Sequence, residues 1–107
     1  MTPIGIAMEL KPGCYDEYKR RHDELWPEMA EVMSANNINM AIYRFNEYLF
    51  VYGNAPSPES WDNVGNHSVT PRWNEYMAEV LKTDDEGNII VHSLPQAFEF
   101  GAFKNEA

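Results

Sequence analysis

The chain has a single cysteine, Cys14, and no long hydrophobic run. One thiol cannot form an internal disulfide, which is typical of proteins from a reducing compartment. No apolar stretch approaches the roughly 20 residues that a membrane-spanning helix needs. No basic segment precedes a hydrophobic stretch at the N-terminus, as a secretory signal would require. These absences predict a cytoplasmic protein.

Positive charge is also scarce, with 8 Lys and Arg against 17 Asp and Glu and a net charge of −9. Such a surface repels the phosphate backbone of nucleic acids and the headgroups of anionic membranes. We therefore expect neither partner. A small neutral substrate fits this charge better.

Motifs that would hold a metal or a cofactor are missing. His22, His67 and His92 share no ligand-type spacing, no cysteine cluster occurs, and no glycine-rich phosphate loop is found. The acidic stretch 83–88 lacks the residue order of a calcium loop. Cys14 stands at a helix start, which can lower a thiol pKa, but nothing else supports a nucleophile there. The sequence predicts a site without metal or cofactor.

The residues that are present form regular patterns over one domain, residues 1–107, with 44% hydrophobic content. Residues 4–10 alternate as a strand does, and a helical period then runs from Tyr15 to Met33. Pro27 interrupts this run and should kink or restart the helix. Residues 34–37, with two asparagines, end it.

Two further strands, 38–45 and 48–53, are joined by the short turn Asn46-Glu47, which predicts an antiparallel hairpin. Both faces of the second strand are apolar, whereas a sheet in so small a domain needs only one apolar face. A second copy of the chain is the simplest cover for the other face.

The second half of the chain predicts a broken helix and a last strand. Ser57-Pro58-Glu59 and Thr70-Pro71 each resemble a capped helix start with proline in the first turn, and residues 97–103 alternate as a strand. The order strand, helix, strand, strand, helix, strand is the ferredoxin-like split βαβ arrangement. We expect an α+β fold, a four-stranded antiparallel sheet with its helices on one face, in a homodimer of the dimeric α/β-barrel type.

The most distinctive chemistry lies in a column of rings. Tyr18, His22 and Trp26 are spaced four apart, so one helix would carry them on one face. His22 is either a core histidine satisfied by one hydrogen bond or a proton-transfer group with a pKa near neutrality. From the residues alone the two readings are evenly balanced.

Two other rings could border a cleft. Trp73 lies near the start of the last helix and is either core or pocket wall, whereas Tyr76, Met77 and Leu81 fit the core better. Tyr43 alternates to the face of Ala41, whose small side chain leaves room beside it.

Three segments resemble the L-rhamnose mutarotases, a family of small dimeric ferredoxin-like sugar epimerases: EYKRRHDELWPEM (17–29), AIY (41–43) and RWNEYM (72–77). The resemblance runs from AMELKPG into the last predicted strand. It implies interconversion of the α and β anomers of a pyranose by ring opening and closure, without a cofactor. It also implies that His22 is the proton donor and that Tyr18, Tyr43 and Trp73 bind the sugar.

The chain departs from that family at Asn74, where the family has a second tryptophan, and in its shorter hairpin turn. An amide in place of a ring can donate and accept hydrogen bonds to a sugar. The substrate is therefore expected to be L-rhamnose or a related 6-deoxysugar such as L-fucose, with Asn74 among the binding residues. The second proton-transfer partner stays open between Tyr18, Tyr43 and water.

Two alternatives use the same elements differently. A cofactor-free oxygenase of the dimeric α/β-barrel type shares the element order and would take a planar apolar substrate, but fold alone does not give function. A non-enzymatic sugar-binding domain would keep His22 as a structural residue.

Overall fold

The structure, a computed structural model, describes residues 1–104, and its strands form one antiparallel sheet in the order β2-β3-β1-β4. The strands are β1 (Thr2–Glu9), β2 (Asn39–Phe45), β3 (Tyr48–Ala55) and β4 (His92–Ser93). The helices are α1 (Tyr15–Asp23), α2 (Pro27–Ala35), α3 (Pro58–Asn66), α4 (Val69–Met77) and the short 3₁₀ helix η1 (Gly101–Phe103). The predicted α+β class and the four-stranded antiparallel sheet are confirmed.

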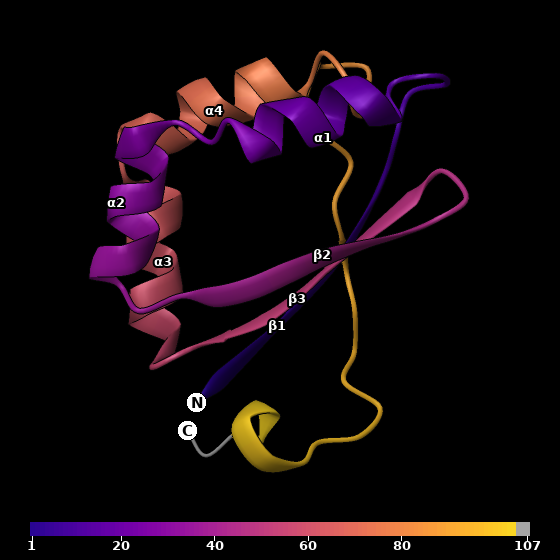
Figure 1. Ribbon diagram of the computed structural model, residues 1–107. Coiled ribbons are helices and arrows are strands. Elements are labelled where there is room, and N and C mark those ends of the chain that lie inside the picture. Colours follow the sequence, from indigo (N-terminus) through magenta and orange to yellow (C-terminus); the bar gives the residue numbers. More distant parts are fainter. Residues whose placement is uncertain (105–107) are drawn as a thin grey trace.

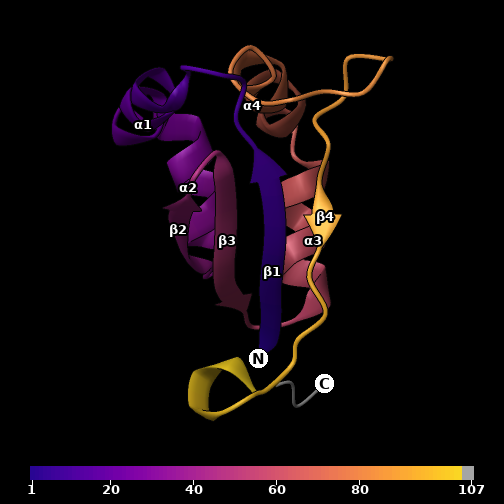
Figure 2. The same cartoon turned by 90° about the vertical axis from the view of Figure 1, so that its right-hand side faces the viewer.

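The helices α1 to α4 gather on one side of the sheet. In Figure 1, α1 and α4 cross above the strands while α2 and α3 run down one end of them. Figure 2 shows β3 and β1 side by side in the middle of the sheet, with the short β4 beside β1. The helix-covered face carries the buried side chains Ile4, Leu49 and Val51. The opposite face, called the outer face below, is exposed at Tyr43, Phe45, Tyr48 and Tyr52.

The hairpin forms as predicted, because Phe45 pairs with Tyr48 across the two-residue turn. Asn46 adopts φ +54° there, a left-handed conformation that asparagine tolerates. At the other end of β3, Gly53 lies against β2 so closely that a Cβ would stand 2.0 Å from the Asn39 carbonyl oxygen. Only glycine permits this approach of the two backbones.

Proline restarts the first helix, as predicted. Helix α1 ends at Asp23, Trp26 is extended with ψ 133°, and α2 begins at Pro27. The residue before a proline is pushed away from helical geometry, which explains the break. The prediction that one helix carries Tyr18, His22 and Trp26 is therefore wrong, since Trp26 lies beyond the end of α1.

The helix start at Ser57 is confirmed, whereas the start at Thr70 is wrong. The Ser57 hydroxyl accepts from the Ser60 backbone N–H at 3.3 Å, with Pro58 in the first turn. Helix α4 begins at Val69, and the Thr70 hydroxyl instead donates to the Val64 carbonyl at 2.5 Å. Pro71 is still tolerated, because N–H groups of a first turn have no helical partner.

The last strand is also displaced from its predicted place at 97–103. It is β4 that pairs with β1, Ser93 opposite Ile6 and His92 opposite Ala7. The chain makes one more ladder bond, from Leu94 N–H to the Gly5 carbonyl, and Pro95 follows it without a donor. Phe98 and Phe100 are left 78% and 79% exposed, and residues 101–103 turn into η1.

None of the helices in residues 1–104 is both long enough and apolar enough to cross a membrane.

Candidate active site

A cavity of about 660 Å³ lies between the helices and the helix-covered face of the sheet. Tyr18, His22, Trp73 and Asn74 all line it, so the structure brings four of the five predicted site residues together. Much of the remaining wall is apolar and comes from α2 and the strands, including Met29, Met33, Met8, Met40 and Val51. A second cavity of about 250 Å³ also borders Tyr18 and His22. These two side chains therefore meet both spaces.

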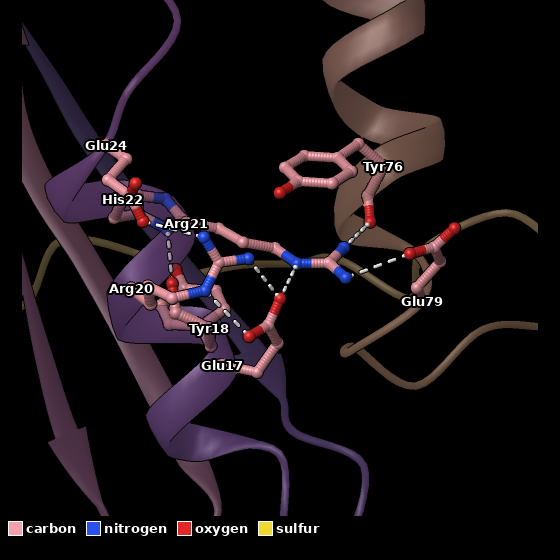
Figure 3. Close-up of polar contacts among 8 residues, drawn as sticks. All are labelled: Glu17, Tyr18, Arg20, Arg21, His22, Glu24, Tyr76 and Glu79. Atoms are coloured by element: carbon pink, nitrogen blue, oxygen red, sulfur yellow. Dashed lines mark hydrogen bonds and ion pairs between the residues drawn. The ribbon is translucent and has the colours of Figure 1, made fainter.

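His22 is partly buried on the last turn of α1, and its Nδ1 lies 3.2 Å from the Tyr18 carbonyl oxygen (Figure 3). A carbonyl can only accept, so Nδ1 carries the proton and the neutral ring has its lone pair on Nε2. Burial lowers the pKa of His22 below its ordinary value, and the bond to Tyr18 offsets part of this effect. At neutral pH the ring can accept a proton at Nε2.

Tyr18 is only 4% exposed, and its ring centroid lies 4.3 Å from that of His22. Its hydroxyl is buried and has no hydrogen-bond partner among residues 1–104. Burial also raises the pKa of Tyr18, so the phenol keeps its proton. A buried hydroxyl without a partner is costly, and Tyr18 also lines the cavity.

Trp73 of α4 lines the cavity and belongs to a cluster of aromatic rings. Trp73 stands edge-on to His22 with centroids 5.3 Å apart, and Trp26 meets Trp73 edge-on at 5.1 Å. Trp26 also stacks on Tyr76 at 5.2 Å. Trp26 therefore packs on Trp73, and Trp73 contacts His22.

Asn74 is exposed and lines the larger cavity beside Trp73. The cavity is also lined by three polar residues that were not predicted as site residues, namely Asp62 and Asn66 of α3 and Thr70 of α4. The α3 pair sits four residues apart, which places both side chains on one helix face. That spacing, directly after Trp61, is the sequence feature that could have indicated a polar cavity wall on α3.

Tyr43 is the one predicted site residue that does not line the larger cavity. It projects from the outer face of β2, 58% exposed, and its ring stacks on Tyr52 at 5.4 Å. It lines the smaller cavity together with Tyr18 and His22. Period-two alternation separates it from Ile42, which faces the helices and lines both cavities.

Within residues 1–104, no group of three or more His, Cys, Asp or Glu side chains is placed so that it could hold a metal ion.

Solved structures with this architecture define the class of fold. The crystal structure of L-rhamnose mutarotase FA22100 from Formosa agariphila superposes with a TM-score of 0.79 at 21% identity, covering 94% of this chain and 100% of that one. PA3566 from Pseudomonas aeruginosa is a more distant likeness, with a TM-score of 0.54 at 10% identity over 92% and 97% of the two chains. The chain thus has the fold of these small α+β proteins.

Sequence comparison identifies the family. Residues 3–100 match the model of the L-rhamnose mutarotase family. Relatives named L-rhamnose mutarotase are 36% identical in Shouchella clausii and 32% identical in Escherichia coli O8, each over 92% of this chain and 97% of the relative. The chain belongs to the L-rhamnose mutarotase family, whose enzymes are isomerases of the racemase and epimerase class acting on carbohydrates. The oxygenase alternative is not favoured by these matches.

Proposed function

We propose that this protein interconverts the α and β anomers of L-rhamnose, or of a close 6-deoxysugar, by ring opening at His22. The observation that carries the proposal is the pairing of two complementary groups on one cavity wall. His22 is a ring whose Nε2 can take a proton, and Tyr18 is a protonated phenol whose hydroxyl lacks a partner among residues 1–104. Family membership supports the same reaction.

The chemistry needs only protons to move. The anomeric hydroxyl gives its proton to Nε2 of His22 as the bond between the anomeric carbon and the ring oxygen breaks, and the ring oxygen then receives that proton from Nε2. The open-chain aldehyde turns about its first C–C bond and closes from the other face, which reverses the transfers. A positioned acid or base with a pKa near the working pH contributes ~10²–10⁴-fold.

Tyr18 supports the ring opening, because its hydroxyl can donate a hydrogen bond to the ring oxygen while negative charge develops there. His22 then returns the proton it received, so the protein ends each cycle unchanged. We favour Tyr18 over Tyr43 in this role, since Tyr43 projects from the outer face of the sheet.

The cavity walls suit a sugar with both apolar and polar edges. Trp73 offers an apolar ring surface, and Asn74, Asp62 and Asn66 offer amide and carboxylate groups along the same cavity. We propose that Trp73 packs on the apolar patch of a 6-deoxysugar and that Asn74 hydrogen-bonds one of its hydroxyls. A charge of −9 disfavours sugar phosphates and leaves a neutral monosaccharide as the substrate.

We further propose that residues 1–107 act as a single domain in a cytoplasmic homodimer. The outer face supports the homodimer, because Tyr43, Phe45, Tyr48 and Tyr52 leave exposed aromatic surface in one continuous part of the sheet. Large exposed apolar patches are typical of interfaces, and a second copy in a barrel-like pair would cover this one.

Saturation-transfer NMR tests the reaction directly. One anomeric proton of the sugar is irradiated and the loss of signal at the other anomer is followed with catalytic amounts of protein. We expect catalysed exchange with L-rhamnose, weaker exchange with L-fucose, and exchange at the buffer rate with D-glucose. Exchange at the buffer rate with every 6-deoxysugar would overturn the proposal.

A further inference from the structure

Arg21 lies on α1 between Tyr18 and His22, directly before His22. Its side chain does not line the cavity and instead extends to α4 (Figure 3). It is 11% exposed, which is rare for an arginine unless its charge is paired. Its Nη1 donates to the Tyr76 carbonyl at 2.6 Å, its Nε donates to Glu17 at 2.7 Å, and its Nη2 lies 3.0 Å from Glu79. Every edge of the guanidinium is therefore engaged.

These contacts form a clamp between two helices. Glu17 belongs to α1, and the Tyr76 carbonyl lies in the last turn of α4, where a cation is favoured. This carbonyl also accepts from the Glu79 backbone N–H at 3.4 Å. The guanidinium carbon also lies 3.9 Å from the centre of the Tyr76 ring. Arginine suits this place because its planar fork donates in several fixed directions at once.

The clamp stays charged throughout the range in which the protein would work. Side-chain hydrogen bonds from Arg20 and Arg21 lower the pKa of Glu17 to about 2. The carboxylate and the guanidinium therefore remain an ion pair in any ordinary buffer, and a pH effect on the site has to come from another group.

A chain of rings leads from the clamp to the site. Tyr76, held at its carbonyl and its ring, stacks on Trp26; Trp26 meets Trp73; and Trp73 stands against His22. The two ends of this path are neighbours in sequence, since Arg21 adjoins His22 on α1 and Tyr76 follows Trp73 by three residues on α4. On each helix, the clamp residue therefore lies within one turn of the ring that takes part in the contact between Trp73 and His22.

We propose that Arg21 is a positioning residue of the reaction, which fixes α4 against α1 and so holds Trp73 against the His22 imidazole. This inference rests on the proposed role of His22. Arg21 does not line either cavity and touches no reacting atom. Its effect is to keep the ring wall closed, so that His22 stays partly dry and in one orientation.

The test uses Arg21→Met and Arg21→Lys in the full chain, with Val32→Ala and Lys82→Met as controls. Arg21→Met removes the clamp, whereas Arg21→Lys keeps the charge and loses the fork. Val32→Ala trims a buried residue of α2 that does not line the cavities, and so lowers stability without altering the clamp. Lys82→Met removes one positive charge from an exposed pair with Glu9.

Two readouts are measured for each variant: kcat and KM for anomer exchange, and the titration of the His22 Cε1 proton by NMR. We expect Arg21→Met to lower kcat by about tenfold or more, since small displacements of reacting groups have effects of this size. We also expect its His22 pKa to rise toward the ordinary value of about 6.5 as water reaches the ring. Arg21→Lys should move both readouts in the same direction but less, which separates packing from charge.

Unchanged kcat and His22 titration in Arg21→Met would overturn the inference. So would the same changes in Val32→Ala, because loss of stability alone would then explain them. If the wild-type protein catalyses no exchange, the proposed function fails, while the His22 titration still tests whether Arg21 keeps the ring wall closed.

Discussion

At the scale of single residues, burial affects the proton affinity of Tyr18 and of His22 differently. They lie one turn apart on α1 and share one cavity wall, yet burial acts on them in opposite directions, raising the pKa of the phenol and lowering that of the imidazole. Burial disfavours the charged form in both cases, which leaves a protonated donor beside an unprotonated acceptor. Pairs of groups separated in this way are typical of acid and base assignments.

The Tyr18 hydroxyl gives the first prediction. In Tyr18→Phe the buried oxygen without a partner is removed, so the free energy of unfolding should stay the same or rise by up to ~1 kcal/mol. Catalysed anomer exchange should nonetheless fall by ~10-fold or more, because the sugar loses its donor. Thermal melts and saturation-transfer rates on the same samples check both parts. A clear loss of stability would contradict the account, since it would show that the hydroxyl is already satisfied.

The lowered pKa of His22 gives the second prediction, on pH. The base form is present above the folded-state pKa, so exchange should decline as pH falls through a midpoint below about 6.5. In that window the unfolded chain binds a proton that the folded chain does not, so His22 also makes stability fall as the pH decreases toward the folded pKa. Rate profiles and melts between pH 4.5 and 8 measure both. A midpoint above 6.5 would contradict the burial argument.

At the scale of elements, the sequence predicted what depends on local periodicity and turn chemistry. The hairpin at Asn46-Glu47, the restart at Pro27 and the cap at Ser57 all follow from rules that act within a few residues. The missed features depend on distant partners. The Thr70 hydroxyl donates to the Val64 carbonyl instead of capping a helix. The last strand forms at β4, where the chain pairs with the edge of β1, although residues 97–103 show the alternation of a strand.

The candidate site was likewise predictable only where it depends on local spacing. His22 and Tyr18 follow from helical spacing, because one turn fixes their neighbourhood. The separation of Tyr43 from Trp73 could not be predicted, since it depends on which face of β2 the helices cover. The sequence indicated only the pairing of Arg21 with Glu17, one helical turn away. The contact with α4 could not be predicted, because Tyr76 and Glu79 are 55 and more residues away and meet Arg21 only in the packed structure.

Two glycines give the third prediction. Gly53→Ala should destabilise the fold by ~2 kcal/mol or more, because the new Cβ would overlap the Asn39 carbonyl and push β2 from β3. Gly65→Ala is the matched control on α3, where nothing lies within 4 Å of the added atom. It should stabilise the protein by roughly 0.5–1 kcal/mol through helix propensity. Denaturant unfolding measures both, and equal effects of the two substitutions would contradict the described register of β2 and β3.

At the scale of the whole molecule, the two faces of the sheet differ in what covers them. The helix-covered face holds the cavity, and the outer face presents Tyr43, Phe45, Tyr48 and Tyr52. The buried Asn54 of β3 donates to the Ala102 carbonyl, and Phe103 packs on Tyr52, so the C-terminal segment covers one part of the outer face. The aromatic surface that stays exposed is the place where we expect the second copy.

This expectation gives the fourth prediction. Phe45→Glu places a charge in the exposed aromatic surface of β2 and should convert dimer to monomer in analytical ultracentrifugation. Phe98→Glu makes the same substitution at a ring that is 78% exposed but lies in the segment after β4, and it should leave the dimer intact. A wild-type protein that sediments as a monomer at micromolar concentration would contradict the proposed homodimer.

The central claim is that His22 transfers the proton that opens the sugar ring. The most direct measurement compares the saturation-transfer rate of L-rhamnose anomers with wild-type protein and with His22→Asn, which keeps a hydrogen-bonding side chain near the Tyr18 carbonyl. We predict a loss of at least ~10²-fold in catalysed exchange, with melting close to that of the wild type. A His22→Asn protein that is folded and still exchanges the anomers at the wild-type rate would contradict the account.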